Sequence, residues 1–186
     1  GAERRAMRGM VFTVDLGRCV GCHACRIACK DRADLPDDVD VLRILVEEGG
    51  AYPAPTLRYR VSHCFHCADA PCVAACAEGA LVQRDDGLVT LDAERCTGCG
   101  GCLTACPFDA IVLGPGGEPH KCDGCADETA QGQAPTCVRA CPLRALGYEA
   151  EGAAAPPPSR TAEEGYLGKG RPRVRYWLRL GSNDAT

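Results

Sequence analysis

The sequence contains few large aromatic side chains, with three phenylalanines, five tyrosines and one tryptophan among 186 residues. Little bulk is therefore available to fill a core, and something besides apolar burial has to hold the fold together. No run of about 18 apolar residues is present, so we expect no membrane-spanning helix. The net charge of −4 provides no broad basic surface for nucleic acid or an anionic membrane. No Ser/His/Asp set, phosphate-binding loop or pair of carboxylates stands out, so we expect no catalytic site in this chain.

Cysteine, by contrast, is abundant, and the sixteen cysteines fall into four groups of four. In every group the first two cysteines are separated by two residues and the last two by three. The groups, in chain order, are Cys19, Cys22, Cys25 and Cys29; Cys64, Cys67, Cys72 and Cys76; Cys96, Cys99, Cys102 and Cys106; and Cys122, Cys125, Cys137 and Cys141.

The spacing distinguishes among three uses of cysteine, namely disulfides, zinc sites and iron–sulfur clusters. A disulfide framework does not need such regular spacing, and cysteines separated by two residues fit it poorly. Zinc sites use two cysteines separated by two residues, but groups one and three contain a third cysteine after two more residues, which a zinc site of this kind does not use. The spacing of these two groups is that of bacterial ferredoxins, which favours four 4Fe–4S clusters.

In two-cluster ferredoxins the fourth cysteine of each group binds the cluster of the other group. Groups two and three are neighbours and are expected to exchange their fourth cysteines in this way, which leaves groups one and four to do the same. This exchange predicts one dicluster module inserted into another. The predicted ligand sets are Cys19, Cys22, Cys25 and Cys141 for cluster 1; Cys122, Cys125, Cys137 and Cys29 for cluster 2; Cys64, Cys67, Cys72 and Cys106 for cluster 3; and Cys96, Cys99, Cys102 and Cys76 for cluster 4.

Short strands are expected between the cysteine groups, at residues 10–16, 41–47 and 56–62, with a hairpin over 81–91 that turns at an Asp-Asp-Gly sequence. The segment Thr13–Cys19 recurs as Thr90–Cys96, and the cysteines of groups one and three match in the same register, which indicates duplication of a structural unit. After Glu151 the composition changes to a proline-rich linker and then a basic stretch with the one tryptophan. We expect this end to be either disordered or an arm that docks on a partner.

The expected fold class is α+β, with two ferredoxin-like dicluster modules, one nested in the other, and an extended C-terminal tail. Residues 10–30 and 114–150 would form the outer module, with cysteine groups one and four. Residues 56–113 would form the inner module, with groups two and three. Residues 31–55 would be an insert, and residues 151–186 a linker and docking tail.

The cysteine groups and their flanking residues closely resemble the four-cluster iron–sulfur subunit of the dimethyl sulfoxide reductase family of molybdenum and tungsten oxidoreductases. The resemblance covers about residues 10–150 and rests on Cys19–Lys30, His63–Cys72, Cys106–Ile111 and Lys121–Pro142. It implies the same exchange of ligands and a row of clusters leading from a large catalytic subunit to a donor or acceptor, with cluster 1 at the catalytic end. The molybdenum or tungsten bis-pterin cofactor is expected in that partner and not here. Ala77 stands where the family has proline, which should alter the local turn, and the presence of Cys102 argues against a three-iron variant.

The expected function is therefore that of a non-catalytic electron-transfer subunit. An independent soluble polyferredoxin and a zinc-stabilised interaction module are the alternatives. A membrane anchor or a soluble redox protein is the candidate second partner. We expect a cytoplasmic location, with export alongside a signal-bearing partner or attachment through an anchor subunit as alternatives, and we interpret Arg4-Arg5 as part of an ordinary charged N-terminus.

Several other residues next to cysteines need a role. The histidines are expected to pack or to donate a hydrogen bond to sulfur rather than to bind iron, because each group already has four cysteines. Two lysines adjacent to cysteines are either solvated surface charges or groups that tune a cluster's potential. Glycines in groups one and three either permit tight turns or let the backbone approach a cluster. These residues are His23, His63, His66 and His120; Lys30 and Lys121; and Gly21, Gly98, Gly100 and Gly101.

Overall fold

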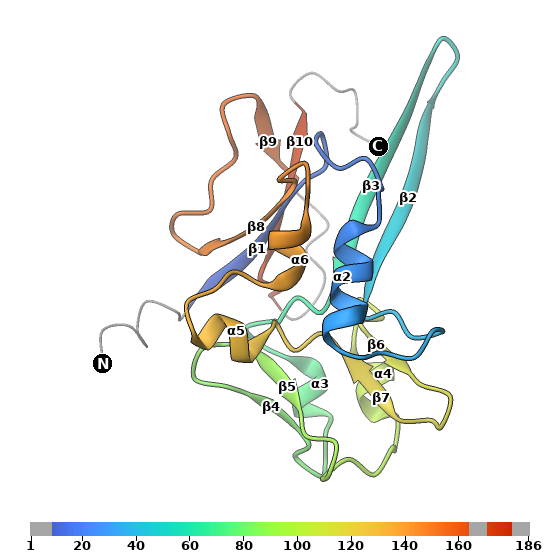
Figure 1. Ribbon diagram of the computed structural model, residues 1–186, viewed down its shortest axis with the longest axis vertical. Coiled ribbons are helices and arrows are strands. Elements are labelled where there is room, and N and C mark those ends of the chain that lie inside the picture. Colours follow the sequence, from blue (N-terminus) through green and yellow to red (C-terminus); the bar gives the residue numbers. More distant parts are fainter. Residues whose placement is uncertain (1–8, 164–170, 180–186) are drawn as a thin grey trace.

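The structure, a computed structural model, describes residues 9–163 and 171–179 (Figure 1). Small sheets and short helices alternate in it, which confirms the α+β class. Within these residues no helix has the length and apolar character needed to cross a membrane. The elements are β1 (Met10–Asp15), α2 (Ala24–Arg32), β2 (Leu42–Ala51), β3 (Ala54–His63), α3 (Pro71–Ala74), β4 (Leu81–Gln83), β5 (Val89–Leu91), α4 (Gly101–Ala105), β6 (Ile111–Leu113), β7 (Pro119–Lys121), α5 (Ala126–Ala130), α6 (Thr136–Ala140), β8 (Leu146–Ala150), β9 (Arg160–Ala162) and β10 (Val174–Arg179).

A four-stranded sheet brings the beginning and the end of the described chain together. Its strand order is β8-β1-β10-β9, with β1 antiparallel to β8 and parallel to β10. β1 is an inner strand, and five of its six residues are buried, which explains why it reads as a nearly continuous apolar run. The strand expected at residues 10–16 is confirmed.

Two segments of the expected C-terminal tail belong to this sheet instead of extending away from it. β10 lies between β1 and β9, and the side chains of Val174, Tyr176 and Trp177 are at most 5% exposed. Once β10 pairs on both edges, its apolar residues enter the core of this chain and are not left for a partner. Residues 164–170 and 180–186 of the expected tail, like Arg4 and Arg5, lie outside the described residues.

β2 and β3 form one long hairpin that projects from the body of the molecule (Figure 1). Its register runs from Leu42 opposite His63 to Ala51 opposite Ala54, so the hairpin extends beyond the strands expected at residues 41–47 and 56–62. Gly50 makes this extension possible. Its φ is 68°, and a Cβ at this position would lie 2.4 Å from the carbonyl oxygen of Ala54, a contact that only glycine avoids.

Two short hairpins complete the strands. The hairpin predicted over residues 81–91 is confirmed, with Leu81 opposite Leu91 and Gly87 in its turn at a φ of 89°. β6 and β7 form the second short hairpin.

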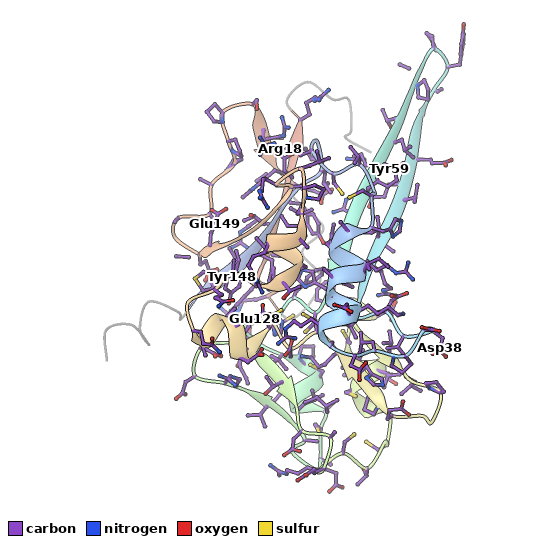
Figure 2. All side chains as sticks on the ribbon, viewed as in Figure 1. Arg18, Asp38, Tyr59, Glu128, Tyr148 and Glu149 are labelled. Atoms are coloured by element: carbon purple, nitrogen blue, oxygen red, sulfur yellow. The ribbon has the colours of Figure 1, made fainter. Side chains whose placement is uncertain are left out.

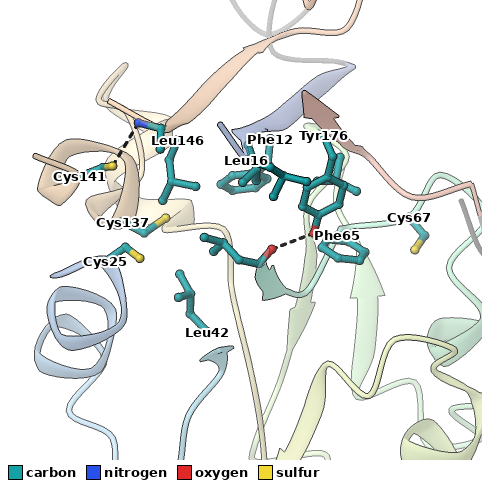
Figure 3. Close-up of a cluster of buried hydrophobic side chains, with 14 residues drawn as sticks. Phe12, Leu16, Cys25, Leu42, Phe65, Cys67, Cys137, Cys141, Leu146 and Tyr176 are labelled. Carbon is teal, nitrogen blue, oxygen red and sulfur yellow. Dashed lines mark hydrogen bonds between the residues drawn. The ribbon is translucent and has the colours of Figure 1, made fainter. Parts of the chain in front are cut away.

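The main core lies where the sheet, the base of the long hairpin and the cysteine loops meet (Figure 3). The few aromatic rings gather there, and the centroids of Phe65 and Phe108 lie 4.8 Å apart in an edge-on contact. Four cysteines are among the buried members of this core: Cys25, Cys67, Cys137 and Cys141. Thiols therefore occupy core positions that larger apolar side chains usually fill.

Candidate iron–sulfur cluster sites

Site 1 gathers three cysteines of group one with the last cysteine of group four. Cys19 and Cys22 lie between β1 and α2, Cys25 lies in α2, and Cys141 follows α6. These four side chains line one cavity together with apolar residues that include Ile44 and Leu146. The Cys141 sulfur accepts a hydrogen bond from the backbone N–H of Ala145 at 3.2 Å (Figure 3).

Gly21 gives the loop of site 1 its shape. Its φ is 67°, and a Cβ there would lie 2.4 Å from the ring of Tyr59. Tyr59 lies on the long hairpin (Figure 2), so the close contact between ring and glycine places this hairpin against the first cysteine loop. The positive φ agrees with the tight turn considered for Gly21, and the close approach of its backbone to a cluster stays a prediction.

Site 2 combines Cys29 of α2 with Cys122, Cys125 and Cys137 of group four, and α2 packs against α6 to bring them together. Burial, and after it the nearby Cys125, raise the pKa of Cys29 to about 12. Cys125 and Cys29 likewise raise the pKa of Cys137, after burial as the main cause. The Cys122 sulfur accepts a hydrogen bond from the N–H of Gly124 at 3.3 Å. Arg32 also ties α2 to group four, through ion pairs with Asp123 and Glu128.

Site 3 gathers three cysteines of group two with the last cysteine of group three. Cys64 and Cys67 follow β3, Cys72 lies in α3, and Cys106 follows α4. They line one cavity whose other walls include Phe65, Phe108 and Ile111. Burial and the thiol of Cys64 raise the pKa of Cys67 to about 12.

Site 4 contains Cys76, which follows α3, with Cys96, Cys99 and Cys102, and these four side chains line a further cavity. The N–H of Gly98 donates to the Cys96 sulfur at 3.4 Å, which repeats the contact between Gly124 and Cys122 in site 2. Backbone amides, that of Leu81 foremost, lower the pKa of Cys76, because N–H dipoles stabilise a thiolate.

The structure thus brings together the four sets of cysteines that the spacing predicts, while ligation itself stays a prediction. All sixteen cysteines lie in the described part of the chain and are free thiols. Among the described residues, no three Cys, His, Asp or Glu side chains lie where they could hold a single metal ion; in sites 1, 3 and 4 the four cysteines surround a cavity instead. Mutual repulsion and burial raise the pKa of most of these thiols. Binding to iron would offset the free-energy cost of forming thiolates that are buried and close to one another, because iron binds the thiolate form. The residues present therefore fit clusters with four cysteine ligands.

Two histidines occupy the junction of sites 2 and 3. His63 and His66 are each 2% exposed, and burial lowers the pKa of His63 to about 4. The Nδ1 atom of His66 accepts the N–H of Val89 at 2.9 Å, and its Nε2 atom lies 3.8 Å from the Cys122 sulfur. The expectation of a histidine close to a cluster sulfur therefore applies to His66.

Neither lysine of interest is simply solvated. Lys30 donates to the backbone carbonyls of Asp37 and Val39. Lys121 donates to the carbonyls of Val89 and Cys122 and lines the cavity of site 3. Lys121 thus belongs to site 3 although it precedes a cysteine of site 2, a position that its place in the sequence did not indicate.

Arg60 is a second residue that the sequence did not single out. It is 3% exposed and pairs with Glu47 on β2 and with Glu163 just after β9. Its guanidinium also lies over the ring of Tyr176, 4.5 Å from the centroid. Arg60 therefore connects the long hairpin to the C-terminal strands. The alternation of residues along β3 did not indicate that this position is buried.

Comparisons with known proteins agree with the cysteine geometry. A family model described as a 4Fe-4S dicluster domain matches residues 56–150. The B subunit of anaerobic dimethyl sulfoxide reductase from Escherichia coli is 40% identical over 74% of this chain and 71% of its own length. The electron transfer subunit of thiosulfate reductase from Salmonella typhi is 38% identical, over 74% of each protein. The B subunit of polysulfide reductase from Wolinella succinogenes is 37% identical, over 75% of this chain and 74% of its own length.

These relatives are named as electron-transfer or B subunits of reductases, and the matched domain is one that carries iron–sulfur clusters. Identity of this level over about three quarters of the chain establishes membership. The chain therefore belongs to the family of iron–sulfur electron-transfer subunits of molybdenum oxidoreductases, whose members carry electrons and do not themselves act on the substrate.

Proposed function

We propose that this chain relays electrons through four 4Fe–4S clusters, one in each of sites 1 to 4, between a catalytic subunit and a second redox partner. The catalytic subunit would carry the molybdenum or tungsten bis-pterin cofactor. The main support is the order of the sites along the molecule, together with the exposure of one cysteine at each end of that order.

The order of the sites follows from the elements that they share. Sites 1 and 2 both draw on α2, which holds Cys25 and Cys29. Sites 3 and 4 both draw on α4 and the residue after it, through Cys102 and Cys106. Sites 2 and 3 meet where His66 contacts Cys122. The sites therefore form a row from 1 to 4.

Each end of this row reaches the surface. Cys22 of site 1 and Cys99 of site 4 are the two exposed cysteines among the sixteen, and the other fourteen are buried or half-buried. Electrons can pass only where donor and acceptor come close, so an exposed ligand at each end suits entry at one end and exit at the other. By analogy with the family, we propose that the catalytic subunit lies at site 1.

The same arrangement supports two nested modules. Sites 1 and 2 use cysteines of groups one and four alone, and β1 pairs with β8 across the whole intervening chain. Sites 3 and 4 use groups two and three alone. We therefore propose an outer module of residues 10–30 and 114–150 around an inner module of residues 56–113.

When bound, each cluster would supply a one-electron carrier whose potential depends on hydrogen bonds, burial and charge. The chain's own contribution is to hold four thiolates around each cavity, to limit water at the central sites, and to direct N–H groups at sulfur. The N–H groups of Gly98, Gly124 and Ala145 already do so. Because sixteen free thiols persist in a reducing compartment, we propose that clusters are inserted in the cytoplasm.

Iron and sulfide analysis of the anaerobically purified complex, joined to a redox titration followed by EPR, tests the relay. We expect about sixteen irons and as many labile sulfides on this chain, with four one-electron signals. A large pterin-containing subunit should be present in the same preparation. Stoichiometric zinc that survives reconstitution, with little iron, would contradict the relay. A fully loaded chain that purifies alone and exchanges electrons with several unrelated enzymes would instead support a free polyferredoxin.

The long hairpin offers a surface for the catalytic subunit beside site 1. Paired residues of antiparallel strands project to the same face, so Val46 and Leu57 continue the face of buried Leu42 and Val61 outward. Val46 is 57% and Leu57 52% exposed. This apolar face continues through Tyr59 to the Gly21 loop, where Val20 is exposed beside Cys22. Since it adjoins the end of the row assigned to the catalytic subunit, we propose that subunit as its occupant.

Val46→Asp should therefore weaken association with the catalytic subunit at least tenfold, or about 1.4 kcal/mol, because a carboxylate would lose its water in the interface. Binding of the separately purified catalytic subunit measures the effect. Iron content should not change. Val82→Asp makes the same substitution on the exposed β4 of the inner module and should bind normally. Equal weakening by both variants, or by neither, would rule out the hairpin face as the docking site.

A further inference from the structure

We infer that His66 donates a hydrogen bond from Nε2–H to the Cys122 sulfur, and so sets the potential of the cluster in site 2 from within the loop of site 3. The inference rests on the proposed clusters and adds a residue that tunes one of them. It is carried by the two ring nitrogens of His66 and by the packing that fixes the ring.

The position of the ring proton follows from the partner of Nδ1. The backbone N–H of Val89 donates to Nδ1 at 2.9 Å, and a nitrogen that accepts a hydrogen bond carries no proton. The single proton of the imidazole is then on Nε2. Nε2 lies 3.8 Å from the Cys122 sulfur, which is within the range of a hydrogen bond to sulfur. The ring therefore presents a donor to this ligand.

The surroundings hold the ring in this orientation. Lys121 donates to the carbonyl of Val89, so both backbone polar groups of Val89 have partners at this site. The ring of Phe12 stacks against His66, with centroids 6.2 Å apart and an interplanar angle of 24°. Gly124 leaves the space that the ring needs, because a Cβ there would lie 3.2 Å from Nε2. A donor held in this way does not have to reorient when a cluster is reduced, so little free energy is spent on reorganisation.

A donor to a ligand sulfur favours the more negative, reduced state of a cluster and raises its potential. His66 lies between Cys64 and Cys67 of site 3 but acts on Cys122 of site 2, which the chain places 56 residues away. The two central sites of the row are thereby joined by one side chain. Its presence should keep the cluster of site 2 easier to reduce than backbone donors alone would make it.

Two substitutions separate the two nitrogens. The side-chain amide of asparagine overlaps the position of Nδ1, so His66→Asn keeps an acceptor for Val89 and removes the donor to Cys122. Asparagine also tolerates the positive φ of 45° at this position. Glutamine reaches the position of Nε2, so His66→Gln keeps a donor to Cys122. His120→Gln is the matched control, because His120 lies only two residues from Cys122 in the sequence but contacts Glu118.

The test is an EPR redox titration of the intact complex, with the signal of site 2 identified by its loss in Cys137→Ser. We expect His66→Asn to lower the ratio of reduced to oxidised cluster in site 2 about tenfold at a fixed potential, which is 59 mV for one electron. His66→Gln should recover most of the shift, and His120→Gln should leave it unchanged. A site 2 signal that is present but unmoved in His66→Asn overturns the inference and leaves the relay intact. Absence of that signal from the unaltered complex would overturn the cluster assignment instead.

A second measurement, on the unaltered complex with His66→Gln as its control, decides the case where His66→Asn fails to assemble. Pulsed EPR of the reduced complex labelled with ¹⁵N-histidine should show nitrogen coupled to the site 2 cluster, and His66→Gln should lose that coupling while keeping the potential. Labelled complex without such coupling would overturn the inference.

Discussion

Replacing Cys141 by alanine should abolish the cluster built on Cys19, Cys22 and Cys25, although Cys141 lies 116 positions after Cys25 in the sequence. Cys141 lines one cavity with Cys19, Cys22 and Cys25, so its loss leaves one iron of that cluster without a protein ligand. We expect about four fewer irons per chain and loss of one EPR signal. Electron flow between the second redox partner and the substrate should fall by more than about 100-fold, since even outer partners of metal ligands cost 10- to 100-fold.

The identity of the lost signal makes this prediction sharp. If the outer groups exchange their fourth cysteines, Cys141→Ala and Cys25→Ala remove the same signal, and Cys137→Ala removes a different one. If each group instead held its own cluster, Cys141→Ala would remove the signal that Cys137→Ala removes. Cys29→Ala gives the reciprocal comparison, because Cys29 lies with Cys125 and Cys137 in site 2. Matching signals from Cys141→Ala and Cys137→Ala would disprove the exchange.

The cysteine sets could be predicted because their spacing records local geometry. Three thiols in a short loop can bind around one corner of a cluster. A helix places the fourth cysteine at a distance from that corner, so this cysteine binds a different cluster. In group one that helix is α2, which begins at Ala24 and bears both Cys25 and Cys29, so a few residues determine which site each thiol faces. The pairing of groups then followed from a rule that needs no knowledge of the rest of the fold.

The tuning and fastening residues could not be predicted in the same way. His66 reaches Cys122, and Arg60 reaches Glu163, across 56 and 103 residues respectively. Such contacts depend on where the modules and strands finally pack. A buried arginine or histidine looks like any surface residue until its partners are in place.

The C-terminal strands show a different limit of the sequence. The proline-rich and basic residues after Glu151 indicated a linker and a tail, and no local feature showed which strand this segment would pair with. β10 pairs in parallel with β1, at the opposite end of the chain. A parallel pair needs a long crossover connection, so its formation is decided by the whole chain and not by its turn sequences. The sequence led us to expect disorder or an arm docked on a partner, and neither expectation placed this segment in the chain's own core.

Loss of the Tyr176 ring should destabilise the protein by about 3–5 kcal/mol, the usual cost of removing a large buried aromatic side chain. Tyr176 is 3% exposed and belongs to the main core (Figure 3). Its hydroxyl donates to the carbonyl of Val61 at 2.8 Å, which joins β10 to the base of the long hairpin. Tyr176→Phe keeps the ring and loses this one hydrogen bond, so it should cost about 1 kcal/mol.

Anaerobic urea unfolding of the cluster-loaded chain measures these differences, and hydrogen exchange should show the loss of protection in β1, the neighbour of β10. Tyr52→Ala is the matched control: Tyr52 is 96% exposed at the tip of the hairpin, and its removal should change stability by less than about 0.5 kcal/mol. The comparison separates the two roles considered for this end of the chain. If Tyr176→Ala proved as mild as Tyr52→Ala and impaired only binding of the catalytic subunit, the segment would serve the partner. A large loss of stability in the chain alone requires that β10 is part of its own core, because a side chain can contribute to folding only where it is buried on folding.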